Sequence, residues 1–177
     1  MINDYLEQQV KTITKLKESS ETIQKIFDVI LDARESEKTI YVMGNGGSAS
    51  TATHFVSDLL KTSITKDKKR FKAVSLSDNI PVILAWSNDK SYDSIFVEQL
   101  KNFLKEGDIV IAISGSGNSQ NVINAINYAN EINAQSISLT GGDGGKLSEI
   151  SKINLLIPSN DMLTIETTHL CVCHLLT

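Results

Sequence analysis

Five short apolar segments, separated by stretches in which apolar residues recur at helical spacing, limit most strongly how this chain can fold. The segments are rich in β-branched residues and mostly apolar on both faces, as parallel strands buried under helices are. They occupy residues 38–44, 71–77, 108–114, 135–141 and 153–158. This alternation predicts an α/β fold, in which a single three-layer domain contains a five-stranded parallel sheet flanked by helices.

A long N-terminal helix is predicted over residues 3–34, and the polar segment KESSE at 17–21 is where this helix can break. Its apolar residues recur at helical spacing. Further helices are expected near 48–61, 91–104 and 119–130, and from about 162 to the end. Thr177 lies within an apolar helical pattern, so we expect the natural chain to continue a little further.

We expect residues 1–177 to form one domain. Its parts would be an N-terminal helical segment (1–35) and an α/β core with the C-terminal helix (36–177). No linker or low-complexity tract interrupts the chain.

The composition excludes several classes of protein. A formal net charge of −4 gives no electrostatic support for general nucleic-acid binding. The basic run KDKKR at 66–70 is expected to be a solvated loop. No run of 18 apolar residues is present, so no membrane span is expected, and the N-terminus lacks a signal-peptide pattern. Two neighbouring cysteines, Cys171 and Cys173, suit a reduced, cytoplasmic protein.

Two glycine- and serine-rich loops follow predicted strands directly. They are GNGGSA at 44–49 and SGSGNS at 114–119. In open parallel sheets, ligands bind at the carboxyl ends of the strands near a topological switch point. Glycine lets the backbone approach a ligand closely, and a helix N-terminus offers free N–H groups to an anion. With the serine hydroxyls, the two loops predict a phosphate site.

Other interpretations of these loops are weaker. GNGGSA also fits the dinucleotide pattern G-x-G-x-x-A, but Asp78 comes later than the acidic residue that this pattern requires. A P-loop is excluded in TGGDGGKL at 140–147, which has Leu147 where serine or threonine is needed. Tight turns without a ligand would explain one such loop better than two. A monophosphate held by serines explains both loops best.

The three histidines lie on two predicted helices. His54 and Asp58 are four residues apart and share a helix face. On the last helix, His169 and His174 point about 140° apart around the axis, so they cannot both face one small site with Glu166. Helical geometry alone leaves open which of these two histidines takes part.

One imidazole and one carboxylate on each helix could bind a divalent metal such as zinc, or act as general acid and base. Histidines with purely structural roles are the competing explanation. The segment HLCVCH at 169–174 also suggests a Cys/His zinc knuckle. Cys171 and Cys173 would point about 200° apart on a helix, however, so small buried apolar residues describe them better.

Five motifs, in order, cover essentially the whole chain: GNGGSA…THF…D, SNDKSYDSIF, ISGSGNSQNVINAI, LTGGDGGKL and IETTHLCVCH. Together they resemble the sugar isomerase (SIS) domain family and, within it, the phosphoheptose isomerases. The resemblance implies a doubly wound, flavodoxin-like fold and a zinc-containing cytoplasmic homotetramer. It also implies conversion of sedoheptulose 7-phosphate to D-glycero-D-manno-heptose 7-phosphate, for lipopolysaccharide or capsule synthesis.

The resemblance also assigns residues by motif. Its sugar-phosphate loop corresponds to Asn45, Gly46, Gly47 and Ser48. Its substrate-contacting pair corresponds to Asn88 and Asp89, and its phosphate loop to Ser114, Gly115, Ser116 and Ser119. Its metal-binding histidines correspond to His54 and His174, of which His174 is also the proposed acid. The choice of His174 over His169 therefore rests on the resemblance.

Two positions depart from the family pattern. The family's catalytic base and metal ligand is a glutamate where this chain has Asp58, and a glutamine of the last helix is Glu166 here. Aspartate is one methylene shorter, which sets its carboxylate roughly 1.5 Å further back. The expected metal set is therefore His54, Asp58, Glu166 and His174. Asp58, or Glu166 in its place, is expected to act as the base.

The expected reaction moves a proton between C1 and C2 of a phosphorylated ketose. The main alternative is a non-enzymatic phosphosugar-binding regulator, such as a tetramer that associates with the bacterial replication initiator. Retention of acid, base or ligand chemistry at all four polar positions argues against a pure binding protein. A nucleotide-dependent oxidoreductase is less favoured still. The apolar side of the N-terminal helix (Leu6, Val10, Ile13) fits a tetramer interface or a cap on its own sheet.

Overall fold

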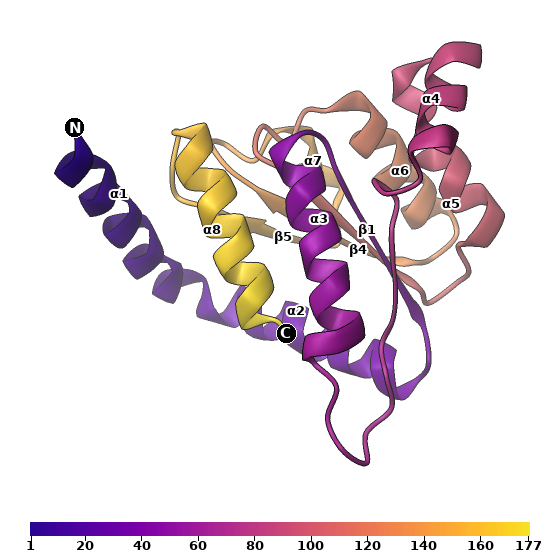
Figure 1. The fold of residues 1–177 in the computed structure, drawn as a ribbon, viewed down its shortest axis with the longest axis horizontal. Coiled ribbons are helices and arrows are strands. Elements are labelled where there is room, and N and C mark those ends of the chain that lie inside the picture. The colour runs from indigo at the N-terminus through magenta and orange to yellow at the C-terminus, as the bar shows by residue number, and fades with distance from the viewer.

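The computed structural model describes residues 1–177 and contains one parallel sheet of five strands (Figure 1). The strands are β1 (Thr39–Gly44), β2 (Lys72–Ser75), β3 (Ile109–Ser114), β4 (Gln135–Thr140) and β5 (Ile153–Leu156). Their order is β2-β1-β3-β4-β5, and every neighbouring pair is parallel. This is the flavodoxin-like order. The predicted three-layer, doubly wound fold is therefore confirmed.

Eight α-helices and three short helical turns precede, connect and follow the strands. The α-helices are α1 (Ile2–Lys15), α2 (Ser20–Glu35), α3 (Gly47–Ser57), α4 (Ile80–Asp89), α5 (Val97–Phe103), α6 (Gln120–Glu131), α7 (Gly145–Ile150) and α8 (Met162–Leu175). The turns are η1 (Leu16–Ser19), η2 (Asp58–Thr62) and η3 (Tyr92–Ser94). The break in the N-terminal helix lies at η1, which overlaps the KESSE segment where a break was predicted.

Two helices were not predicted, and one expected helix is divided. Over 91–104 the structure has η3 followed by the shorter α5. Ahead of them, α4 begins where the Asn79 side chain accepts a hydrogen bond from the Val82 N–H, with proline in the first turn. The six-residue helix α7 follows a glycine-rich stretch that indicates a turn. Local capping and tertiary contacts, not periodicity, define both helices.

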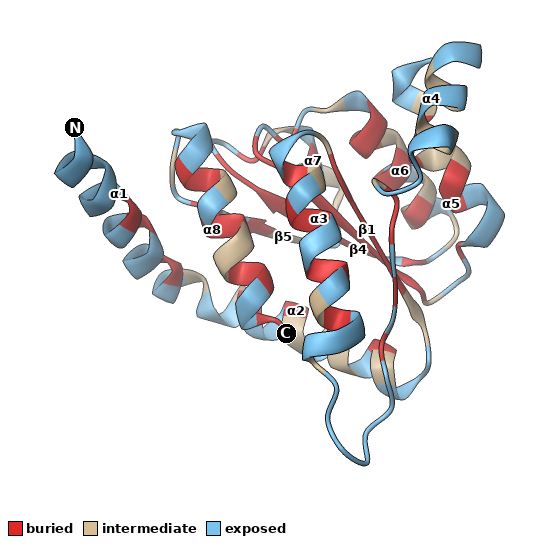
Figure 2. Cartoon of the chain, in the orientation of Figure 1, coloured by how far each residue is buried: buried red, intermediate tan, exposed pale blue.

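Alternate residues of each inner strand enter two separate cores, so the sheet is buried on both faces (Figure 2). On β1, Ile40 and Val42 join the larger core, which is formed with α2, α3 and α8. Tyr41 and Met43 join the second core, which is formed with α5, α6 and α7. Burial on both faces explains why these strands are continuous apolar runs.

The N-terminal helix α1 extends away from the sheet (Figure 1). It packs on α8 through buried Gln9 and Thr12, while Leu6, Val10 and Ile13 are 55, 66 and 40 % exposed. Of the two alternatives for this apolar side, a cap on the chain's own sheet is therefore excluded. None of the helices is both long and apolar enough to cross a membrane.

Candidate active site

The sheet order places both serine-rich loops at one switch point. β1 lies between β2 and β3, so the chain leaves β1 toward β2 and later returns to β3 on the other side of β1. The loops after β1 and β3 are therefore neighbours at the carboxyl edge of the sheet, where such folds bind ligands.

The first loop turns sharply into α3. Gly46 precedes this helix with φ +53°, a conformation that favours glycine. At Gly47, an added Cβ would overlap the carboxylate of Glu166 from α8. This glycine thus allows the Glu166 carboxylate to lie against the N-terminus of α3, where the helix dipole favours negative charge.

A cavity of about 150 Å³, here called the serine cavity, lies between the two loops. From the first loop it takes Asn45 and Ser48, from the second Ser114, Gly115, Ser116 and Ser119, and from α8 Glu166. Ser119 occupies the N-cap position of α6, but its side chain makes no capping hydrogen bond. A small cavity rich in hydroxyls at a helix N-terminus suits a phosphate group. Gly46 and Gly47 shape the loop without lining this cavity.

The glycine-rich segment before and within α7 braces the second loop. Gly117 has φ +64°, and an added Cβ there would overlap the Gly144 carbonyl. The Leu147 N–H donates to the Gly117 carbonyl at 3.0 Å, and the Lys146 N–H donates to Asn118 Oδ1 at 2.9 Å. The segment TGGDGGKL, which fails as a P-loop, is thus a support for the predicted phosphate loop.

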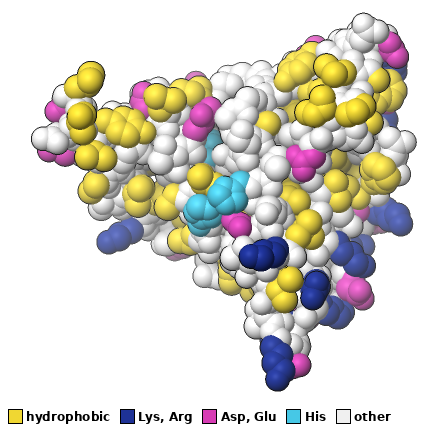
Figure 3. All heavy atoms as spheres, viewed as in Figure 1, with side chains coloured by type: hydrophobic (Ala, Val, Ile, Leu, Met, Phe, Trp, Pro, Cys, Tyr) yellow, Lys and Arg dark blue, Asp and Glu magenta, His cyan; other side chains and the backbone are white.

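A compact group of ionisable side chains forms where α3 and α8 lie side by side. His54 Nε2 and His174 Nε2 lie 3.4 and 3.8 Å from Asp58 Oδ2. The two ring centroids are 5.0 Å apart, and both imidazoles are about half exposed, forming one surface patch (Figure 3). Thr62 donates to the other oxygen, Asp58 Oδ1, at 3.0 Å and so fixes the carboxylate.

This group satisfies the basic requirement for a divalent metal site. One ligand atom from each of the three residues lies within 4.8 Å of the others, and two imidazole nitrogens with one carboxylate oxygen suit zinc. Glu166, which the sequence adds to this set, lies outside the group and lines the serine cavity instead. The three donors present fit such an ion.

The buried histidine has a different role from the exposed pair. His169 is fully buried and its Nε2 lies 3.3 Å from the Thr140 carbonyl at the end of β4. Burial lowers the pKa of His169 to about 4, although the hydrogen bond to Thr140 opposes this shift. His169 is therefore a neutral contact between α8 and the sheet, and His174 is the histidine of α8 that meets Asp58.

No cysteine belongs to the metal-binding group, in agreement with the preference for small apolar residues over a Cys/His knuckle. Cys173 lies in the larger core, and burial, with a smaller contribution from the Asp58 charge, raises the pKa of its thiol to about 12. Cys171 is a half-buried free thiol.

Asn88 and Asp89, at the end of α4, do not line the serine cavity. They are exposed and hydrogen-bonded to each other at 2.8 Å. The neighbouring Tyr92 instead reaches Asn45, as does Asn121 of α6. Sequence analysis did not identify the contact between Asn121 and Asn45. The only related feature in the sequence is that Asn121 follows the phosphate-loop residue Ser119 by two positions, in the first turn of a helix.

Comparison with known proteins decides the family. The model of the SIS domain matches residues 4–141. The chain belongs to the SIS domain family. Among curated relatives of this SIS protein, a phosphoheptose isomerase of Aliarcobacter butzleri is 36 % identical over 175 residues, covering 98 % of this chain and 92 % of that protein.

A second phosphoheptose isomerase, from Helicobacter pylori strain P12, is 34 % identical and covers 99 % of this chain and 94 % of its own. The solved structure of a phosphoheptose isomerase from Francisella tularensis superposes with a TM-score of 0.93 at 28 % identity. That comparison covers 99 % of this chain and 93 % of the other. The likeness thus extends over whole chains and includes the N-terminal helix.

Proposed function

We propose that this SIS protein is an aldose–ketose isomerase of the phosphoheptose isomerase type. Its substrate would be sedoheptulose 7-phosphate and its product D-glycero-D-manno-heptose 7-phosphate, for lipopolysaccharide or capsule synthesis. The observation that carries the proposal is the pairing of a serine-lined cavity with an acid–base group farther along α3 and α8. Relatives above 30 % identity with the isomerase name support the same activity.

The serine cavity would hold the phosphate. Its lining contains no lysine or arginine, so the phosphate would be bound by hydroxyl and N–H donors and by the N-terminal end of α6. The sugar chain would then extend along α3, away from the loops.

The length of the substrate favours Asp58 over Glu166 as the base. Seven bonds join the phosphorus to C2 of a heptose 7-phosphate, which span roughly 9 Å when extended. Ser48 and His54 are six residues apart on α3, a rise of about 9 Å. The reacting carbons would thus reach the group around Asp58, whereas Glu166 stays beside the phosphate.

Isomerisation requires a base at the carbon next to the carbonyl and a proton shuttle at the oxygens. Asp58, held by Thr62, would take the proton from that carbon, and His174 would move a proton between the two oxygens. A divalent ion such as zinc, held by His54, Asp58 and His174, would supply polarisation of the carbonyl.

Incubation of the purified protein with sedoheptulose 7-phosphate and zinc, followed by NMR detection of the aldose, tests this function. We expect turnover in the wild type and its loss in Asp58→Asn and in His174→Ala, with the fold retained. Turnover of Asp58→Asn near the wild-type rate would remove Asp58 as the base. Substrate binding without turnover in the wild type would instead favour the non-enzymatic regulator.

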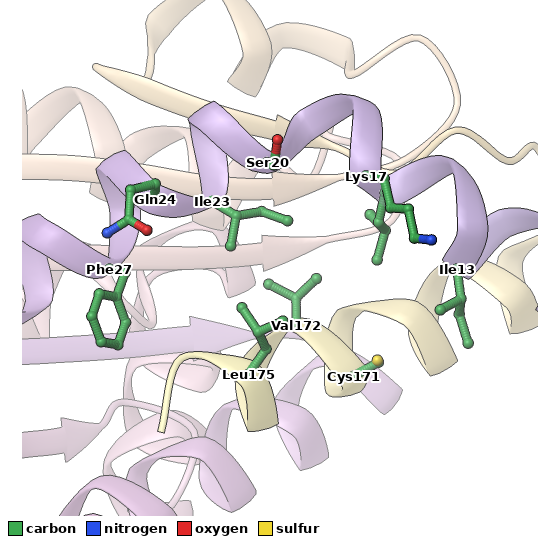
Figure 4. Close-up of a pocket in the computed structure, with 10 residues that line it drawn as sticks. Ile13, Lys17, Ser20, Ile23, Gln24, Phe27, Cys171, Val172 and Leu175 are labelled. Carbon is green, nitrogen blue, oxygen red and sulfur yellow. The ribbon is translucent and has the colours of Figure 1, made fainter.

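We also propose that the protein acts as a homotetramer. Besides the exposed apolar side of α1, a groove of about 500 Å³ lies between α8 and the α1–α2 segment (Figure 4). Ile13, Ile23, Phe27, Val172 and Leu175 line it. Apolar surface of this kind is typical of contacts between subunits. Sedimentation of a monomer at micromolar concentration would contradict the proposal. The cytoplasmic location and the single domain over 1–177 stay predictions.

A further inference from the structure

Three side chains from separate parts of the chain meet at Asn45, which lines the serine cavity. Asn45 follows β1, Asn121 lies in the first turn of α6, and Tyr92 begins η3. Asn121 Nδ2 donates to Asn45 Oδ1 at 2.9 Å, and Asn45 Nδ2 donates to Asn121 Oδ1 at 3.0 Å. The Tyr92 hydroxyl donates to Asn45 Oδ1 at 2.8 Å. This group is here called the amide network.

A backbone group fixes the orientation of both amides. The N–H of Val122 can only donate, and it is shared between the Ser119 carbonyl at 3.1 Å and Asn121 Oδ1 at 3.0 Å. An NH2 group in place of this oxygen would set two donors against each other. The other amide atom of Asn121 is therefore its NH2, so the Asn45 atom that faces this NH2 must be the acceptor, Oδ1. Asn121 is only 2 % exposed, which shields its side of the amide pair from water, whereas Tyr92 is 51 % exposed.

The amide network leaves one hydrogen-bonding group of the Asn45 side chain unused. An amide oxygen has two lone pairs, and Asn121 and Tyr92 occupy both. Of the two N–H groups of Asn45, one donates to Asn121. The group that remains is one N–H donor, on a residue that lines the serine cavity.

Such a donor matters because the cavity lacks a basic side chain and contains the Glu166 carboxylate. An anion there depends on neutral donors, and a flipped amide would turn a lone pair toward it. We propose that Asn121 and Tyr92 are positioning residues, which hold the Asn45 amide so that its free N–H donates to an oxygen of the bound substrate. That oxygen belongs to the phosphate or to the adjoining sugar. The identity of the substrate rests on the proposed function.

The test compares Asn45→Asp, Tyr92→Phe and Asn121→Asp with two matched controls, Tyr128→Phe and Asn127→Asp. Tyr128 and Asn127 lie on α6, and their side chains form no hydrogen bond with the amide network. Loss of one hydrogen bond should lower kcat/KM for sedoheptulose 7-phosphate by about 3- to 10-fold in Tyr92→Phe, and by more in Asn45→Asp. The controls should match the wild type.

Titration with inorganic phosphate identifies the oxygen. Weaker phosphate binding in Asn45→Asp, with KM raised, would assign the donor to the phosphate. Unchanged phosphate binding with a lower kcat would assign it to a sugar oxygen. Asn45→Asp also adds a negative charge, so either result supports the proposal when Tyr92→Phe, which adds no charge, changes in the same direction.

NMR of the side-chain amides tests the positioning without any isomerase activity. The Asn45 signals are assigned by their loss in Asn45→Asp, and they should shift in Tyr92→Phe but not in Tyr128→Phe. This readout does not need Asn121→Asp, whose buried charge can impair folding. An inactive wild type would refute the proposed function while these shifts still test the amide network. Wild-type Asn45 signals, phosphate affinity and kcat/KM in Tyr92→Phe would overturn the proposal.

Discussion

Acidification should destabilise the protein through His169, the fully buried histidine between α8 and β4. Its pKa is lowered to about 4 in the folded state by burial, against an ordinary value of 6.5. Between these two values the unfolded chain binds the proton and the folded protein does not, so stability falls as the pH falls. From pH 7 to pH 5 the loss amounts to about 2 kcal/mol. For a chain of 177 residues this lowers Tm by roughly 6 °C.

The assay is urea unfolding at pH 7 and pH 5, compared between the wild type and His169→Gln. Glutamine can still donate to the Thr140 carbonyl but does not titrate, so its loss of stability on acidification should be smaller by about 2 kcal/mol. His54→Gln is the control, since that imidazole is half exposed, and it should keep the acid-side loss. Equal losses of stability in the wild type and His169→Gln would refute the assignment to His169.

Other substitutions separate the roles of neighbouring positions. Gly117→Ala should destabilise the protein by about 2 kcal/mol or more, since its φ is +64° and the Gly144 backbone blocks a Cβ; thermal melts check this. Gly47→Ala should cost less stability, because only the flexible Glu166 side chain must move, yet it should change the affinity for inorganic phosphate in calorimetry. His54→Ala should weaken zinc binding at least about tenfold in competition with a chromophoric chelator, whereas Cys171→Ser should not. Val10→Lys should lower the mass seen by sedimentation without changing the monomer's stability beyond roughly 0.5 kcal/mol, because Val10 is 66 % exposed.

The inner strands β1, β3 and β4 were predictable because burial on both faces makes them nearly continuous apolar runs. A parallel sheet then follows from the helices between the strands. The helix α4 was not predicted because none of its residues is buried, so its sequence lacks the apolar stripe of a helix packed on a core. The pairing of His54 with Asp58 follows from helical spacing alone. By contrast, the contact of His174 with Asp58 depends on how α3 and α8 pack, which local sequence patterns do not predict.

The same limit applies to Glu166 and Asn121. Glu166 was expected beside the histidines, but its place against Gly47 results from a glycine 119 residues earlier in the chain, on another helix. Asn121 lies 76 residues from Asn45, and only the pairing of β1 with β3 brings their loops together. Sequence patterns therefore predict which residue types the site contains better than which of them touch.

The neighbourhood of β1 and β3 also bears on how the protein folds. These adjacent strands bring together residues as distant as Thr39 and Asp108, which are 69 positions apart. Closing so long a loop is slow, because the chain loses conformational entropy before the contacts between the strands can stabilise it. Helices such as α2 and α6 can form earlier from local contacts. During refolding, helical structure should therefore return before the capacity to bind a sugar phosphate, and chains that fail to pair these strands would be helical but inactive.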